Sequence, residues 1–352
     1  MALLLTYLES RNRLKNGMKL GFALVTLLGV IHYNYGNDYM AYYDIYKSIV
    51  NVPFNFSNVI GGYVYKEPGW ALINYAFKPI GGFFMMVAVL NIIQNVIYYR
   101  FIKNNVARSW WPVAIFIYLF SSNFYLLNFS MMRQGLVIAV FLAMWKYIKA
   151  KKWHIALVGL ILAASVHSSA LILLPFSFWG FIKMKNGKVW AIIYLVLFFF
   201  LWSADDFLNG VFEALIIFEE FQEYSYYLND AESVEFGVGF LINMLPFVVS
   251  IYYLMIDKEQ TEQNHQLVAL ATIGFMILPF GQIIPLISRV GMYFGAFSIC
   301  AFTDSYSIIR NRYMRWIMIG IYVAITLYDY WNFFNNSVYA DSYYHFKTIF
   351  TA

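Results

Sequence analysis

Apolar runs long enough to cross a membrane recur along almost the whole chain, from near residue 18 to near residue 332. A transmembrane helix needs about 20 mostly apolar residues to cross the hydrocarbon core of a bilayer. Of the 352 residues, 61% are hydrophobic and 12% are charged, whereas soluble domains carry about 25% charged residues. The sequence therefore predicts an all-α polytopic membrane protein, with residues 1–352 forming a single integral membrane domain.

Basic clusters between the apolar runs indicate the orientation, because cytoplasmic loops are enriched in lysine and arginine. With these clusters inside, we expect about eleven transmembrane helices, a cytoplasmic N-terminus and an external C-terminus. Most of the 24 lysines and arginines then lie on the cytoplasmic side. The predicted spans are residues 18–33, 82–101, 109–126, 133–149, 153–166, 169–182, 188–204, 237–256, 266–284, 288–308 and 313–332.

Residues 153–182 fit either one long helix or two short helices. A single helix would place the next basic cluster, which begins at Lys183, on the outer side and reverse every later span. Two short helices hinged near His167 keep that cluster inside. We therefore expect a helical hairpin that brings His167 to the outer face.

Two long segments are expected on the outer side, over residues 34–81 and 205–236. Within the first, Pro68 to Phe77 is too short to cross, and Pro79 with the glycines after it breaks a helix. We expect a short interfacial helix there. The second segment is rich in aspartate and glutamate.

Several classes of function and site are disfavoured. The net charge of +5 does not indicate nucleic-acid binding, because the basic residues form short clusters between spans rather than one solvated face. The single cysteine, Cys300, excludes an intramolecular disulfide. No second ligand stands at metal-binding spacing from His167. We therefore expect no nucleic-acid partner, no metal and no cofactor.

Two arginines begin predicted spans on the outer side. Arg133 starts the span 133–149, where an unpaired guanidinium facing lipid would cost several kcal/mol. It either binds an anion such as a phosphate or pairs with Asp38 or Glu67. Arg289 starts the span 288–308, as a second arginine for a pyrophosphate or as an interfacial residue that reaches to the headgroups.

Three further residues could take part in acid–base chemistry. His167 is a candidate general base or phosphate donor, or a packing histidine bonded to a backbone carbonyl. Asp38 precedes tyrosines at helical spacing, including Tyr42 and Tyr46, which suits sugar binding and equally suits a membrane interface. Glu67 is either an anion stabilised by a helix dipole or a second carboxylate of the site.

Several short motifs of this sequence resemble those of the EpsG family of Wzy-like exopolysaccharide polymerases. They cover most of the chain in the order that the family has them. The matching segments are Gly36-Asn37-Asp38 with Tyr42 and Tyr46, Glu67-Pro68-Gly69-Trp70, Asn128 with Met132-Arg133-Gln134, the block from Trp153 to Pro175 around His167, Ser288-Arg289 with Tyr293, and the tail from Tyr343 to Phe350.

The resemblance implies a bacterial inner-membrane, multi-pass glycosyltransferase with a fold akin to the GT-C membrane enzymes. It would join undecaprenyl-diphosphate-linked oligosaccharide repeat units at the outer face without a metal, with a chain-length-control protein as a candidate partner. Its residues would be catalytic His167, Asp38 and Glu67, and pyrophosphate-binding Arg133 and Arg289. The sugar-binding residues would be Tyr42, Tyr46, Gln134, Tyr293 and Tyr343.

The residues agree with that chemistry on physical grounds. Transfer from a diphosphate carrier builds negative charge on the leaving pyrophosphate, and fixed cations stabilise it. A membrane O-acyltransferase takes its acyl donor from the cytoplasm, whereas the polar residues here are expected to face the outer side. That class of enzyme is therefore disfavoured. A glycolipid transporter is disfavoured because charges near the middle of the spans are almost absent. Another lipid-linked sugar transferase or an O-antigen-ligase-like enzyme remains open, since the same arginines would serve it.

Overall fold

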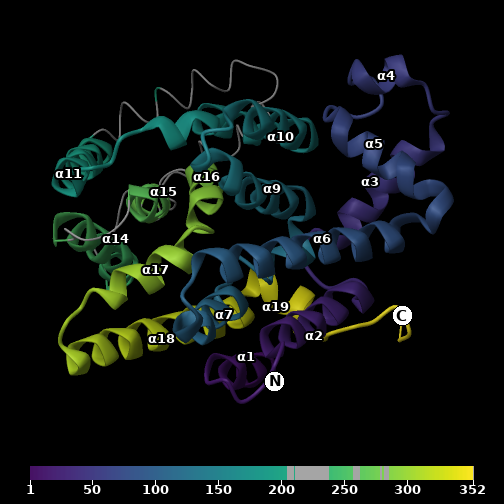
Figure 1. Cartoon of the computed structure of the whole chain (residues 1–352). Helices are drawn as coiled ribbons and strands as arrows, with labels where there is room; N and C mark the ends of the chain where they lie inside the picture. Colours follow the sequence, from purple (N-terminus) through teal and green to yellow (C-terminus); the bar gives the residue numbers. More distant parts are fainter. Residues whose placement is uncertain (204–209, 211–237, 257–261, 278–279, 281–284, 352) are drawn as a thin grey trace. The chain divides into compact units, whose positions relative to one another are not determined.

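The computed structural model describes residues 1–203, 210, 238–256, 262–277, 280 and 285–351 (Figure 1). Over these residues the secondary structure is helical, apart from an isolated antiparallel bridge between His32 and Thr348. The predicted all-α class is therefore confirmed. Of the acidic segment 205–236, all residues except Gly210 lie outside the described ones.

The chain divides into two compact units. The first comprises Met1–Ser177 and Ile317–Ala352, and the second comprises Phe178–Trp316. The α-helices lying wholly or mostly in the first unit are α1 (Ala2–Ser10), α2 (Gly17–Ile31), α3 (Tyr39–Asn51), α4 (Phe56–Ile60), α5 (Pro68–Phe77), α6 (Gly82–Asn105), α7 (Trp111–Phe120), α8 (Leu127–Ser130), α9 (Met132–Lys149), α10 (Trp153–Val166), α18 (Arg312–Asn335) and α19 (Ser337–Tyr343). Its 3₁₀ helices are η1 (Lys78–Ile80), η2 (Arg108–Trp110) and most of η3 (Ser168–Phe181).

Glycines allow the long helices of the first unit to approach closely. Helix α2 packs on α6, α6 packs on α9, and α9 packs on α10. A Cβ atom at Gly29 of α2 would lie 2.5 Å from Oδ1 of Asn91 in α6, and one at Gly159 of α10 would lie 2.3 Å from Sδ of Met144 in α9. Small residues at such crossings are typical of helices that pack without a hydrophobic driving force.

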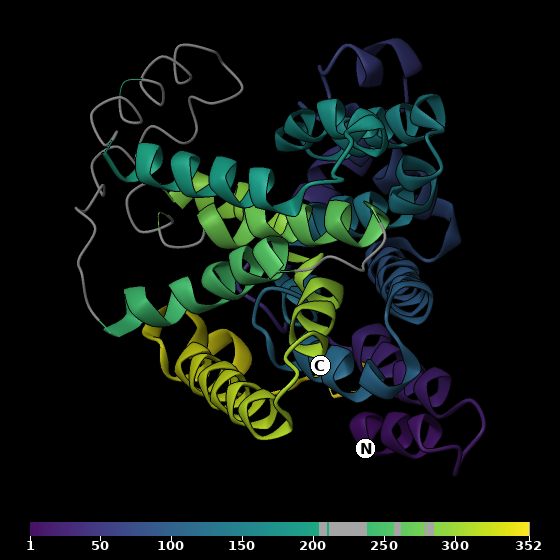
Figure 2. The same ribbon diagram turned by 60° about the vertical axis from the view of Figure 1, so that its left-hand side comes forward.

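The second unit packs around one central helix. Its helices among the described residues are α11 (Gly187–Ser203), α14 (Val238–Ile256), α15 (Glu262–Ile277), α16 (Pro285–Gly295) and α17 (Ser298–Ser307). Each of the other four contacts α15 (Figure 2). The indole of Trp179 donates to the carbonyl of Gln266 over 3.0 Å, and the Gln266 amide donates to the carbonyl of Ile182 over 2.8 Å. These bonds hold residues 179–182, at the start of the unit, against α15.

The predicted break near His167 divides residues 153–182 into two helical segments, but these do not pack closely against each other as the expected hairpin would. Helix α10 ends at Val166, and His167 is extended with φ −149° and ψ 113°. The following segment is a 3₁₀ helix rather than the expected α-helix, and it contains Pro175, which lacks the N–H that an α-helix needs. A 3₁₀ helix rises about 2.0 Å per residue, so this short segment is longer than an α-helix of the same residue count.

Other boundaries also differ from the expected spans. Helix α7 covers only the first part of 109–126, and the span 288–308 is divided into α16 and α17 after Gly295, a residue type that favours helix ends. The short helix expected from Pro68 to Phe77 is α5, while its interfacial position stays a prediction. Helices α1 and α3 were not expected.

Two described helices are long and apolar enough to cross a membrane, Gly82–Asn105 and Arg312–Asn335, and six shorter apolar stretches have 10–17 residues. Large apolar side chains on these shorter helices are more than half exposed, among them Val158, Leu162, Val196 and Phe199. Soluble proteins rarely expose such a surface, so the structure is compatible with a membrane protein. The count of eleven spans, the orientation and the GT-C architecture stay predictions.

The C-terminal tail is held against the start of the chain by backbone bonds. The N–H of Gly36 donates to the carbonyl of Ser342 over 3.2 Å, and the N–H of Tyr33 donates to that of Lys347 over 3.0 Å. Gly36 has φ +114°, and a Cβ atom there would lie 2.6 Å from the carbonyl oxygen of Phe129. Only a glycine can therefore adopt this conformation so close to Phe129.

Replacing Gly36 with alanine should lower stability through both backbone strain and this clash. Gly62→Ala is a matched control, because Gly62 also has a positive φ of +77° but the nearest atom to its Cβ would be 3.9 Å away. Strain of this kind costs about 1–3 kcal/mol, so thermal unfolding in detergent should show Gly36→Ala to be clearly the less stable variant. Equal melting temperatures would contradict the close approach.

Candidate functional site

Contacts from three distant parts of the chain meet at the carboxylate of Glu67. Its Oε2 atom forms an ion pair with Nη1 of Arg133. Its Oε1 atom lies 3.2 Å from Nδ1 of His167 and accepts the backbone N–H of Ser168 over 3.2 Å. The Glu67 side chain is only 3% exposed. His167 and Ser168, at the break after α10, and Arg133 of α9 therefore meet the segment 34–81 at one buried charge.

The start of α5 places Glu67 at this point. Pro68 occupies the first helical position, which suits its fixed φ, and Glu67 precedes it without capping its own helix. A Cβ atom at Gly69 would lie 2.2 Å from Oγ of Ser165, so only glycine allows α5 to lie this close to the end of α10. This approach brings Glu67 within reach of Ser168.

Ser168 begins η3, and its N–H is one of the donors that a helix start leaves without an intrahelical acceptor. The extended conformation of His167 directs this N–H and the imidazole to the same oxygen of Glu67. Because an ionised carboxylate only accepts hydrogen bonds, Nδ1 of His167 carries the hydrogen. The other ring nitrogen, Nε2, is therefore the basic nitrogen of a neutral imidazole.

Arg133 lies in the first turn of α9, where the helix dipole disfavours a cation. The ion pair with Glu67 offsets this cost, and contacts with two aromatic rings stabilise the guanidinium further. The guanidinium carbon lies 5.6 Å from the ring centroids of both Tyr42 and Tyr65, and Nε donates to the Tyr42 hydroxyl over 3.4 Å. The Arg133 side chain is 17% exposed, so it is the most accessible member of the Glu67–Arg133–His167 cluster.

The surroundings keep Glu67 ionised. Burial raises the pKa of its carboxyl, but the hydrogen bond from His167, the charge of Arg133 and the N–H of Ser168 outweigh burial and bring the pKa below the ordinary value. Burial raises the pKa of the Tyr42 phenol in spite of the neighbouring arginine, so Tyr42 remains neutral. A carboxylate with a lowered pKa is a weak base, so Glu67 suits holding its partners in place better than accepting a proton.

Asp38 lies apart from this cluster in the contacts that the structure gives. Its backbone N–H donates to Oγ of Ser130 over 3.2 Å, and its side chain is exposed. The Asp38 charge acts on Tyr42 and Tyr343. Its catalytic role stays a prediction.

The residues predicted to bind sugar are buried. The ring of Tyr42 packs edge-on against Trp70 at 5.6 Å, Tyr46 packs against Phe83 at 5.8 Å, and Tyr343 packs against Tyr35 at 4.9 Å. Gln134 is also buried. Each of these side chains contributes to packing, and a role in sugar binding stays a prediction for all of them.

Arg289 and Tyr293 belong to α16 of the second unit. Arg289 is half-buried and Tyr293 is fully buried. The predicted roles of both residues in binding the substrate stay predictions. Among the described residues, no group of three His, Cys, Asp or Glu side chains could hold a metal ion.

Two members of the site were not predicted from the sequence. The backbone N–H of Ser168 could have been found from its place directly after the predicted hinge, where a helix start has free donors. Tyr65 contacts Arg133 from two residues before Glu67, and the sequence carries no signal that distinguishes it from the other tyrosines of this segment.

Comparison with protein families gives one match, to the model described as the EpsG family, over residues 19–348. This match covers nearly the whole chain and confirms the resemblance seen in the short motifs. No curated protein and no solved structure matches the chain.

The lowered pKa of Glu67 predicts a pH-dependent stability. The stabilisation from its ion pair and hydrogen bonds is fully present above the ordinary glutamate pKa of 4.5 and is lost as pH falls through the lowered value. Glu67→Gln should cost about 3–5 kcal/mol at neutral pH, because it leaves Arg133 largely buried without a countercharge.

Thermal unfolding in detergent at neutral pH and at about pH 3 measures this effect. The difference between the wild type and Glu67→Gln should shrink at the lower pH. Asp44→Asn is the control, because Asp44 forms an exposed ion pair with Lys47 that should matter little. A difference that stays constant over this pH range would show that the carboxylate charge does not stabilise the site.

Proposed function

The chain belongs to the EpsG family, and from this membership together with the contacts of Glu67 we propose that it is a polysaccharide polymerase of the membrane. The family is associated with glycosyltransferase and polymerase activity in exopolysaccharide biosynthesis. The substrate is an oligosaccharide repeat unit linked to undecaprenyl diphosphate, and the reaction takes place at the outer face of the bacterial cytoplasmic membrane. The observation that carries the proposal is that one buried carboxylate holds both an imidazole and a guanidinium.

His167 is the general base in this proposal. Glu67 keeps the hydrogen on Nδ1, as the aspartate does in a serine-protease triad, and the Nε2 atom takes the proton from the acceptor hydroxyl. The acceptor oxygen then forms a bond to the anomeric carbon while the bond from that carbon to the phosphate oxygen breaks. The pyrophosphate leaves with the bonding electron pair and remains attached to the lipid. Glu67 acts as a positioning residue.

Arg133 stabilises the leaving pyrophosphate. Its guanidinium can bind two oxygens at once, and the N-terminus of α9 adds the partial positive charge of the helix dipole. Its contact with Glu67 leaves further donors of the guanidinium for a phosphate, since arginine carries five N–H groups. The proposed second arginine, Arg289, would serve the same anion.

The membrane arrangement is part of the proposal. We place the N-terminus inside, the C-terminus outside and the Glu67–Arg133–His167 cluster on the outer side, as the distribution of lysine and arginine favours. The lipid bilayer holds the carrier of the substrate, and a chain-length-control protein is the proposed partner. A fold akin to the GT-C glycosyltransferases, which act on lipid-linked sugars, is likewise part of the proposal.

Substitutions of the proposed base and arginines should damage turnover far more than folding. His167→Ala should abolish polymer formation, and Arg133→Lys should slow it about a hundred- to a thousand-fold, the usual effect of losing one contact to developing charge. Arg289→Lys tests the second arginine in the same way. The measurement is polymerisation by purified variants in nanodiscs with a synthetic undecaprenyl-diphosphate-linked repeat unit.

Matched controls come from exposed residues of the same types in the first unit. His154→Ala changes a histidine at the other end of α10, and Arg108→Lys changes an arginine that donates to the backbone of Glu9 and lies 5.8 Å from the ring centroid of Trp111. Both should keep normal rates. Near-normal polymerisation by well-folded His167→Ala would remove the proposed base, and normal rates for Arg133→Lys would remove the proposed contact to pyrophosphate.

A further inference from the structure

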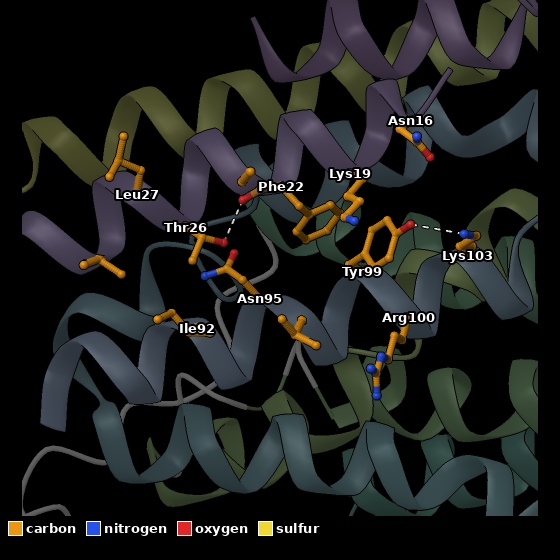
Figure 3. Close-up of a pocket in the computed structure, with 13 residues that line it drawn as sticks. Asn16, Lys19, Phe22, Thr26, Leu27, Ile92, Asn95, Tyr99, Arg100 and Lys103 are labelled. Carbon is orange, nitrogen blue, oxygen red and sulfur yellow. Dashed lines mark hydrogen bonds between the residues drawn. The ribbon is translucent and has the colours of Figure 1, made fainter. Parts of the chain in front are cut away.

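A groove of about 710 Å³ lies between α2 and α6, away from the Glu67 cluster. Its walls run from Lys19 to Val30 on α2 and from Ile92 to Lys103 on α6. Figure 3 shows Lys19, Tyr99 and Lys103 together at one end, and Leu27 and Ile92 towards the other. The groove therefore has a basic end and an apolar end.

The basic end carries three exposed cations, Lys19, Arg100 and Lys103. Lys103 donates to the Tyr99 hydroxyl over 3.1 Å and lies 5.4 Å from the centroid of that ring. In the part of the chain that the structure describes, none of the three cations forms an ion pair with a carboxylate. Lys19 and Lys103 can therefore accept an anion, and Arg100, whose side chain points to the other side of α6 in Figure 3, adds positive charge nearby.

The sequence explains why these cations are not neutralised by the two helices. There is no aspartate or glutamate between Glu9 and Asp38, nor between Glu67 and Asp205, so α2 and α6 contain no acid. Glu9, at the end of α1, uses its Oε2 atom to accept the backbone N–H of Met18 over 2.7 Å. The three cations outnumber this one acid, so the net charge at this end of the groove is positive.

The rest of the groove offers an apolar surface. Leu27, Ile92 and Val96 are 55%, 42% and 40% exposed. The polar side chains along the wall are satisfied within the protein: Thr26 donates to the carbonyl of Phe22 over 2.6 Å, and Asn95 accepts from the Tyr118 hydroxyl over 2.9 Å. A molecule bound along this part of the groove therefore needs no polar groups to pair with the protein.

The length of the groove fits one leaflet of a bilayer. Eleven residues separate Lys19 from Val30 in α2 and Ile92 from Lys103 in α6, and at about 1.5 Å per residue this is about 16 Å. Half of the hydrocarbon core is about 15 Å thick. The basic end lies among the clusters that the positive-inside rule places in the cytoplasm.

We propose that this groove binds an anionic phospholipid of the cytoplasmic leaflet, with its headgroup phosphate at Lys19 and Lys103, further positive charge from Arg100 nearby, and one acyl chain along Leu27, Ile92 and Val96. The positive charge favours binding of a phosphate group. The length of the apolar wall favours a lipid over a soluble phosphate. The site is separate from the proposed polymerase chemistry. It gives the protein a preference for anionic membranes.

Lipid retention by the purified full chain tests the proposal, measured by native mass spectrometry after incubation with phosphatidylglycerol or phosphatidylcholine. The wild type should retain phosphatidylglycerol in clear preference. Replacing Lys19, Arg100 and Lys103 together by glutamine should lower this retention about a hundred-fold, since each basic residue near an anionic headgroup contributes about 1 kcal/mol. Val96→Trp, which fills the apolar part, should lower retention of the lipid as well.

A matched control removes the same charge elsewhere. Lys183, Lys185 and Lys188 are exposed basic residues before and at the start of α11, and their replacement by glutamine should leave retention unchanged. Arg133→Lys should also leave it unchanged, which separates this result from the fate of the polymerase proposal. Glycerol phosphate, which lacks acyl chains, should not stabilise the protein against heat.

Equal retention by the wild type and the triple glutamine variant would overturn the proposal. Equal retention of phosphatidylglycerol and phosphatidylcholine by the wild type would do so too. Stabilisation by glycerol phosphate as large as that by phosphatidylglycerol would show a soluble-anion site instead of a lipid site. Unchanged retention by Val96→Trp would show that the acyl chain does not lie in the groove.

Discussion

The site in the first unit depends on one buried charge, the carboxylate of Glu67. An ionised carboxylate is costly to remove from water unless donors surround it, and here Arg133, His167 and the N–H of Ser168 supply them. These donors come from the starts of α9 and η3 and from the break after α10. One anion therefore fixes the relative positions of three helix ends, and it also fixes which nitrogen of the imidazole is basic.

The scarcity of acids gives Glu67 this importance. No aspartate or glutamate occurs between residues 68 and 204, so cations in that long stretch must find their anions in other segments, in lipid or in substrate. Arg133 of this stretch pairs with Glu67, and we propose that it also binds the pyrophosphate in the reaction. Lys19 lies in a second acid-free stretch, residues 10–37, and we propose that it binds lipid phosphate together with Lys103.

The sequence predicted features that depend on local patterns or on charge counting. The break at His167 followed from the need to keep Lys183 and its neighbours inside, and α5 followed from Pro68 and the glycines after Phe77. The sequence could not choose between Asp38 and Glu67 as the partner of Arg133, because that choice depends on the close approach of Gly69 to Ser165. It also could not show that Tyr42, Tyr46 and Tyr343 are buried, since a tyrosine suits packing, a membrane interface and a sugar site equally well.

Glu67 and Arg133 stabilise the site as a pair, and a double-mutant cycle measures their coupling directly. The free energy of unfolding in mixed micelles would be compared for the wild type, Glu67→Gln, Arg133→Gln and the double variant. The account predicts that the double variant is less destabilised than the sum of the single variants, with a coupling energy of about 2–3 kcal/mol. Additive effects, with a coupling below about 0.5 kcal/mol, would contradict it.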